Sequence, residues 1–292
     1  MPEYLYHYTS VDVLELILKN KTIRFNPLTK MDDPLEQWSK HGRQEGSMVF
    51  ISSWTDAEEE IAKMWIDYCR PDASVGIRIR LPKNPFSLSK NLLPDGNAET
   101  LAELISVQKE FIWKTLHKYP KDVMQHKTML AVAMDQNKNG AAELKRIIND
   151  IEHKYVVCHT KDLNSILKKV EYTDDIDKIY PEMYIDYMGD HLEFYHEFGV
   201  YKDTTWAWQK EWRYRLHFRM FTPGIRHHDG TIDLYPLPFN YYDLVLDEEM
   251  IKDMQIMLSP VISDEAKDKV KRIVKEYNPS AEIVFSNLER LD

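Results

Sequence analysis

The stretch TTWAWQKEWRYRL, residues 204–216, alternates polar and apolar side chains from Glu211 onward. We take it as a strand, in which successive side chains point to opposite faces. The polar face then carries Gln209, Glu211, Arg213, Arg215 and His217, and the apolar face carries Trp208, Trp212, Tyr214, Leu216 and Phe218. An apolar face has to lie on a core, but a solvated strand needs no such row of Gln, Glu and Arg. The pattern therefore predicts that the polar face is the wall of a site.

Composition and charge exclude several classes of protein. The 292 residues are 43% hydrophobic and 29% charged, which is ordinary for a globular chain able to bury a core. A net charge of −10 argues against nucleic-acid binding driven by phosphate attraction alone. Cys69 and Cys158 lie far apart and suggest neither a disulfide framework nor a zinc site. With no signal-peptide pattern at residues 1–10 and no apolar run of transmembrane length, we expect a cytoplasmic protein without a membrane partner.

The hydrophobic pattern predicts strands near both ends of the chain and helices between them. Strands are expected at 3–10, 22–25, 48–54, 74–81, 154–160, 168–173, 254–260 and 281–286, and a hairpin is expected around 221–231. Helices are expected after Ser10, after a capping box from Thr55 to Glu58, at about 97–153, within 175–198 and after Ser263. Residues 28–38 read as a loop because Asp-Asp-Pro interrupts regular structure. We predict one α+β domain, 1–292, with a mainly helical insertion around 97–153.

Three short motifs carry polar residues at the ends of expected strands. They are YHYTS with His7, FISSW with Ser52 and Ser53, and QKEWR with Gln209 and Glu211. Each motif alone has a structural explanation, such as a satisfied histidine, a capping serine or a solvated glutamate. On a strand, Gln209 and Glu211 would share one face, roughly 6–7 Å apart.

Together with their spacing, these motifs resemble a known family. The order YHYTS…TIRF, DDPLE, SSW…MW and WQKEWR resembles the bacterial and phage family called domain of unknown function 2971. That family usually has Asn-Asp-Pro where this chain has Asp32-Asp33-Pro34, and a Glu where this chain has Gln209. The resemblance spans most of the chain and leaves 97–153 the least anchored part.

The family is in turn similar to the ADP-ribosyltransferase superfamily, which implies a split β-sheet core and NAD as substrate. The superfamily signature of His, Ser and Glu on three strands matches His7, Ser52 or Ser53, and Glu211. The resemblance assigns catalysis to Glu211 and to Gln209, the latter acting toward the acceptor. It assigns cofactor binding to His7, Tyr8, Thr9, Arg24, Ser52, Ser53 and Trp54.

The chemistry fits these residue types. Breaking the bond between nicotinamide and ribose builds positive charge on the sugar, which a carboxylate such as Glu211 would stabilise. His7 would hold the adenosine-side ribose, and the backbone beside Tyr8 would take the carboxamide. Arg24 would meet the pyrophosphate or pair with Asp32, Asp33 or Glu36. Aromatic side chains that would wall the nicotinamide ring are Tyr6, Tyr8, Trp54 and Trp65.

The resemblance thus implies an NAD-dependent ADP-ribosyltransferase or NAD glycohydrolase, of the kind found in bacterial or phage defence and effector systems. The acceptor stays open: a protein side chain, a nucleic-acid base, a small molecule or water. One alternative is a nucleotide-binding or interaction module without catalysis on the same fold. Another is a metal-dependent nuclease that uses His7, Asp32, Asp33 and Glu36.

Overall fold

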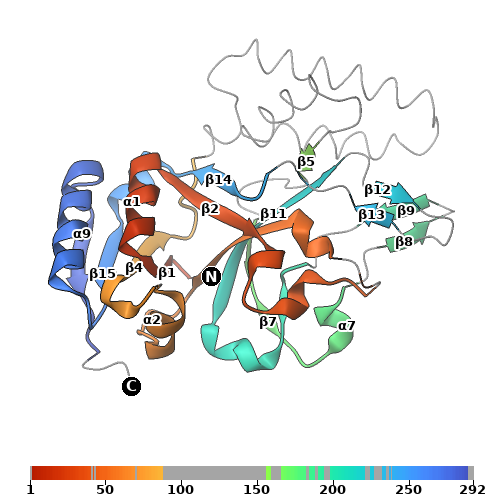
Figure 1. Ribbon diagram of the computed structural model, residues 1–292, viewed down its shortest axis with the longest axis horizontal. Helices are drawn as coiled ribbons and strands as arrows, with labels where there is room; N and C mark the ends of the chain where they lie inside the picture. The colour runs from red at the N-terminus through yellow and green to blue at the C-terminus, as the bar shows by residue number, and fades with distance from the viewer. Residues whose placement is uncertain are drawn as a thin grey trace, which may run out of the picture.

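A large, mainly antiparallel sheet organises the chain (Figure 1). The computed structural model describes residues 2–40, 42, 44–69, 71–87, 156–158, 166–181, 184–187, 190–193, 198–220, 224–226, 232–234, 237 and 239–288. Within them the protein is α+β, as the sequence predicts. The expected helical stretch at about 97–153 lies outside the described residues.

The strands form one large sheet and three small ones. The large sheet contains β1 (Tyr4–Ser10), β2 (Thr22–Pro27), β3 (Val49–Thr55), β4 (Gly76–Pro82), β5 (Val156–Cys158), β6 (Leu167–Lys169), β11 (Glu211–Met220), β14 (Tyr242–Val245), β15 (Gln255–Leu258) and β16 (Glu282–Phe285). The small sheets pair β7 (Glu171–Tyr172) with β10 (Tyr201–Lys202), β8 (Tyr184–Tyr187) with β9 (Asp190–Glu193), and β12 (Gly224–Arg226) with β13 (Ile232–Leu234).

Helices and 3-10 turns connect these strands. The α-helices of the described residues are α1 (Val11–Asn20), α2 (Ala62–Tyr68), α7 (Ile176–Ile179), α8 (Glu248–Lys252) and α9 (Asp264–Tyr277). The 3-10 turns are η1 (Leu28–Lys30), η2 (Pro34–Gln37), η3 (Glu45–Met48), η4 (Ala73–Val75) and η5 (Thr204–Gln209). None of the described helices has the length and apolar character that a bilayer crossing requires.

The large sheet divides at β3. One edge of β3 pairs with β11 over its whole length, from Val49 opposite His217 to Thr55 opposite Glu211. The other edge is shared: its start pairs with β2 through Phe50 and Ile51, and its end pairs with β1 through Thr55 alone. The strands β2 and β1 therefore diverge beside residues 52–54, and α1 bridges them in the chain. This fork is where the candidate site lies.

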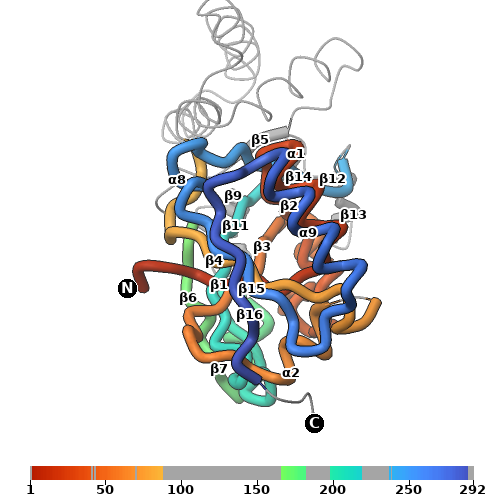
Figure 2. Tube along the Cα trace, turned by 90° about the vertical axis from the view of Figure 1, so that its left-hand side faces the viewer, coloured from red at the N-terminus to blue at the C-terminus, as the bar shows by residue number. Residues whose placement is uncertain are grey.

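Apolar residues fill both faces of the sheet. The main core contains Leu14 of α1, Val270 of α9 and the apolar face of β11. Figures 1 and 2 show α1 and α9 side by side, and Lys269 of α9 forms ion pairs with Asp12 and Glu15 of α1 at 2.6 and 3.1 Å. A second cluster around Trp65 packs α2 on the opposite face of β1. Burial of these faces supplies most of the driving force for the fold.

Most of the expected elements are confirmed at both ends of the chain. Ser10 accepts a hydrogen bond from the Val13 amide at 3.4 Å and caps α1, and Ser263 accepts one from the Ala266 amide at 3.2 Å and caps α9. The predicted strand–helix–strand tail is β15–α9–β16, with β15 and β16 parallel. The predicted hairpin is β12–β13, although residues 227–231 at its expected turn lie outside the described residues.

Two expected helix features are wrong. Thr55 does not cap a helix, because it is still in β3, where its hydroxyl donates to the Lys210 carbonyl at 3.1 Å and accepts from the Ala57 amide at 3.2 Å. The helix α2 starts only at Ala62. In the described part of 175–198, the expected helix is reduced to the single turn α7, which is followed by the paired strands β8 and β9. Pro181 follows that turn, and the Tyr-rich residues after it favour strands.

Candidate functional site

A cavity of about 440 Å³ opens at the fork of the sheet, a volume typical of small-molecule sites. Its walls come from β1, α1, β2, β3, α2, β10, η5 and the start of β11. All nine residues that the resemblance assigns to catalysis or to cofactor binding line this one cavity: His7, Tyr8, Thr9, Arg24, Ser52, Ser53, Trp54, Gln209 and Glu211. Residues from four separate parts of the sequence thus converge where the strands diverge.

His7 bridges the fork. Its Nδ1 lies 2.8 Å from the Ser53 carbonyl oxygen, at a point where β1 and β3 are no longer paired. Because a carbonyl only accepts, Nδ1 carries the proton and Nε2 is left as an acceptor. Burial lowers the pKa of His7 and outweighs the bond to Ser53, so the ring is neutral at pH 7. The ring also lies against Trp54, with centroids 5.0 Å apart.

The two serines separate into different roles. The Ser52 hydroxyl is buried and accepts a hydrogen bond from Trp54 Nε1 at 3.0 Å. Ser53 instead makes a side-chain hydrogen bond to Glu211, which helps to lower the pKa of that carboxyl. Of the two candidates, Ser53 is therefore the residue that contacts Glu211.

Gln209 does not lie on the strand with Glu211, contrary to the period-two prediction. It ends the 3-10 turn η5, and Lys210 follows in a left-handed conformation with φ 47° before β11 begins at Glu211. The 3-10 turn and the left-handed Lys210 interrupt the alternation that a continuous strand would have. Gln209 and Glu211 nevertheless meet through a third residue, because the Lys202 ammonium donates to Gln209 Oε1 at 2.8 Å and contacts Glu211 Oε2 at 3.3 Å.

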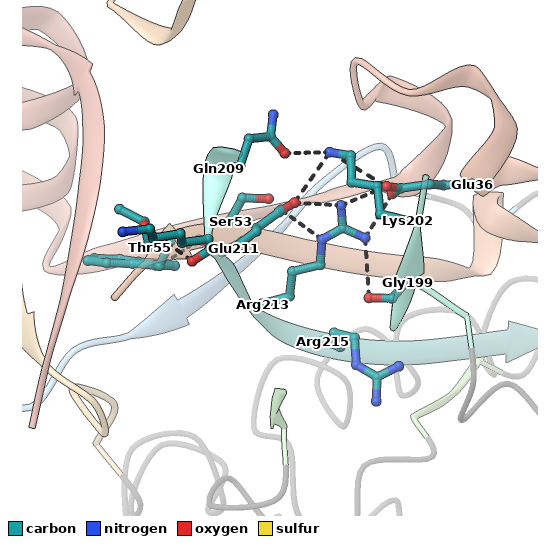
Figure 3. A network of polar contacts seen from close by, with 12 residues as sticks. Glu36, Ser53, Thr55, Gly199, Lys202, Gln209, Glu211, Arg213 and Arg215 are labelled. Carbon is teal, nitrogen blue, oxygen red and sulfur yellow. Dashed lines mark hydrogen bonds and ion pairs between the residues drawn. The ribbon is translucent and has the colours of Figure 1, made fainter. Parts of the chain in front are cut away.

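On the polar face of β11, Glu211, Arg213 and Arg215 are buried rather than solvated. Figure 3 shows the contacts that Glu211 and Arg213 make. Arg213 donates two hydrogen bonds to Glu211, from Nε to Oε1 at 2.7 Å and from Nη2 to Oε2 at 2.9 Å. The same guanidinium contacts Glu36, with Nη2 to Oε1 at 2.9 Å and Nη1 to Oε2 at 2.7 Å, and it donates to the Gly199 carbonyl at 3.2 Å. Lys202 lies 3.6 Å from Glu36. Two cations and two carboxylates thus form one neutral buried network.

The network fixes the charge on Glu211. Burial by itself raises the pKa of a carboxyl, but Arg213 and then Lys202 outweigh it and lower the pKa of Glu211 to about 2. Glu211 is therefore ionised at neutral pH. Burial raises the pKa of Glu36, and Arg213 and Lys202 only partly offset that effect. The pKa of Arg213 is raised because its two carboxylates outweigh its burial.

Sequence reasoning missed Glu36, Lys202 and Tyr68 as parts of this site. Glu36 reaches the network because Asp33 caps η2, its Oδ1 accepting from the Leu35 amide at 2.9 Å. The sequence named Glu36 only as a possible partner of Arg24 and as a ligand in the nuclease alternative, not as a partner of Arg213. Tyr68 of α2 lines the cavity, and its hydroxyl accepts a hydrogen bond from Gln209 Nε2.

Some expected contacts are not found. Arg24 pairs with Asp243 of β14, with Nε to Oδ1 at 2.9 Å and Nη2 to Oδ2 at 3.0 Å, and not with Asp32, Asp33 or Glu36. Trp65 is fully buried in the second cluster and does not line the cavity, whereas Tyr6, Tyr8 and Trp54 do.

The four residues of the nuclease alternative do not assemble around one point. His7 Nδ1 is engaged by the Ser53 carbonyl, Asp33 caps η2, and Glu36 is paired with Arg213. In the described part of the chain, no three His, Cys, Asp or Glu side chains gather as metal ligands.

Compared with protein-family models, with curated proteins and with solved structures, the chain shows no significant match in any of the three searches. The family resemblance of its motifs accordingly remains an expectation, and any function has to be argued from the cavity itself.

Proposed function

We propose that the protein is ADP-ribosyltransferase-like, binds NAD in the cavity at the fork, and transfers its ADP-ribose to an acceptor or to water. The observation that carries this proposal is the convergence of His7, Ser53 and Glu211 from β1, β3 and β11 on one cavity. These are the residue types, in the chain order, that the superfamily signature requires. A role in defence or as an effector follows only from the resemblance.

The proposed chemistry is cleavage of the bond between nicotinamide nitrogen and ribose C1′. The bond's electron pair leaves with nicotinamide, and the cation left on the ribose is stabilised by the ionised Glu211. The oxygen or nitrogen of the acceptor then bonds to C1′ and loses its proton, and with water the products are ADP-ribose and nicotinamide. Gln209, held by Lys202 and Tyr68, would orient the acceptor.

A second candidate function, nucleotide binding without catalysis, is favoured by one observation. A carboxylate has about four acceptor positions, and Glu211 already receives two bonds from Arg213, one from Lys202 and one from Ser53. A ribose hydroxyl would have to displace one donor. Lys202 is the donor most easily displaced. Its 3.3 Å contact with Glu211 is longer than the two bonds from Arg213, and Lys202 keeps its bond to Gln209.

Two measurements separate these functions. With a chelator present, NAD is expected to raise the melting temperature, because a ligand that binds only the native state stabilises it. Incubation with NAD labelled in the adenylate part, with and without a cell lysate, then tests for labelled acceptor or free ADP-ribose. Stabilisation together with product supports the transferase, and stabilisation without product supports the binding module. No stabilisation by millimolar NAD and no product would contradict the transferase, and no stabilisation by AMP or ATP either would contradict the binding module.

A further inference from the structure

The outer end of the cavity has a surface that the proposed chemistry does not use. Arg24 of β2 lies over the Tyr241 ring, with its guanidinium carbon 3.6 Å from the ring centroid. The two bonds to Asp243 fix the plane of the guanidinium. The side chain is still 49% exposed and lines the cavity. The planar Arg24 guanidinium is thus covered by Tyr241 on one face and fixed by Asp243, while much of the side chain remains accessible.

The helix α1 contributes an exposed apolar strip to the same cavity. Val13 and Leu16 are 37% and 54% exposed, although the buried face of α1 is formed by other residues. Val13, Leu16 and Asn20 are spaced by three and four, which places them on one face of the helix, and all three line the cavity. Exposed aliphatic side chains beside a fixed guanidinium favour a flat, apolar-faced and hydrogen-bonding ligand.

We propose that this end of the cavity is a subsite for an adenine base, which stacks on the Arg24 guanidinium and contacts Leu16 and Val13. Bases stack readily on guanidinium planes. Asn20 supplies the edge contact, because a side-chain amide donates to adenine N7 and accepts from its exocyclic amine. The subsite rests on the proposed function, since it takes the adenine end of NAD and places Arg24 on the base rather than on the pyrophosphate.

The test compares Arg24→Lys with wild type in calorimetric binding of NAD, ADP-ribose and nicotinamide mononucleotide. Lysine keeps the charge opposite Asp243 but lacks the planar stacking surface. We expect affinity for NAD and ADP-ribose to fall about tenfold, a typical loss for one stacked base, and affinity for the mononucleotide, which has no adenine, to stay unchanged. Equal losses for all three ligands, or no loss for any, would overturn the subsite.

Arg80→Lys is the matched control. Arg80 also lies over a tyrosine, 4.5 Å from the Tyr4 centroid, and near a carboxylate, 3.9 Å from Asp253, but it does not line the cavity. Arg80→Lys should leave the affinity for all three ligands unchanged. A loss there comparable to that of Arg24→Lys would mean that the effect is general and would overturn the subsite.

Asn20→Ala tests the choice of adenine. Wild type should bind NAD more tightly than nicotinamide hypoxanthine dinucleotide, which lacks the exocyclic amine, and Asn20→Ala should bind the two equally. If wild type shows no such preference, the adenine assignment is wrong. If wild type binds AMP but not NAD, the proposed function fails and the subsite stands, whereas binding of no adenine nucleotide removes both.

Discussion

At the scale of the residue, the decisive fact is that Glu211 is not a free carboxylate. Arg213 binds both of its oxygens, and Lys202 and Ser53 complete its hydrogen bonding. A buried charge that loses its partner is strongly destabilising. Glu211→Gln is nearly isosteric, so packing alone would be expected to leave the fold intact. The structure changes that expectation, because the substitution would leave Arg213 and Lys202 with Glu36 as their only carboxylate in the network.

We predict that Glu211→Gln and Glu36→Gln both lower the free energy of unfolding, by about 3–5 kcal/mol each. Of these two residues, Glu211 lines the cavity and Glu36 does not. NAD turnover should therefore fall on the order of a hundredfold or more in Glu211→Gln and much less in Glu36→Gln. NAD affinity should change little, since the charge acts mainly in the transition state. Urea unfolding and initial rates on the same preparations check this. Equal turnover in wild type and Glu211→Gln would exclude a catalytic role.

His7→Ala should weaken NAD binding about 5- to 30-fold, corresponding to about 1–2 kcal/mol for a hydrogen bond lost in a pocket. The substitution also removes the bond to the Ser53 carbonyl, so some loss of stability is expected in any case. Affinity and melting temperature therefore have to be measured together. A lower melting temperature with unchanged affinity would leave His7 as a structural bridge of the fork and remove its proposed ribose contact.

At the scale of the element, the junction of η5 and β11 sets where Glu211 points. Lys210 takes a left-handed conformation with φ 47°, and its carbonyl accepts the Thr55 hydroxyl at 3.1 Å. The Glu211 amide donates to the Tyr172 hydroxyl at 2.8 Å. The single residue between the turn and the strand therefore allows Gln209 and Glu211 to reach the same lysine.

Replacing Lys210 by Val should destabilise the protein by about 1–3 kcal/mol, because a β-branched residue is strained at positive φ. Lys210→Gly removes the same side chain but tolerates the conformation, so it is the control and should cost at most about 1 kcal/mol. Denaturant unfolding measures both variants. Equal stability of the two would mean that the backbone at this junction relaxes to another conformation.

At the scale of the whole molecule, the buried network joins two parts of the chain that are distant in sequence, Glu36 and residues 202–213. Glu36 comes from η2, Lys202 from β10, Gln209 from η5, and Glu211 and Arg213 from β11. The network is neutral only while both carboxylates are ionised. Its stability should therefore respond to acid as one unit.

The pKa of Glu211 is lowered from 4.5 to about 2 by folding. Its contribution to stability is therefore complete above about pH 4.5 and is lost as the pH falls through about 2. The contribution of Glu36 to stability has the opposite pH dependence: because folding raises the pKa of Glu36, that contribution decreases as the pH rises. We predict that the unfolding free energy of wild type falls more steeply over this range than that of Glu211→Gln. Urea titrations at several pH values check it, and parallel curves would show that Glu211 is not held ionised by the network.

Local sequence patterns predict the α+β class, the terminal strands and both serine caps, and the family resemblance of the motifs singles out nine of the residues that line the cavity. These features depend on local pattern, on capping chemistry and on short motifs, which a single chain displays directly. The sequence did not determine that Gln209 leaves the strand, that Glu36 pairs with Arg213, or that Arg24 lies on Tyr241 beside Asp243. Each of these depends on contacts between residues distant in sequence, or on a left-handed residue that alternation cannot reveal. Only the tertiary structure, by dividing the sheet at β3, brings those residues together and decides which charges meet.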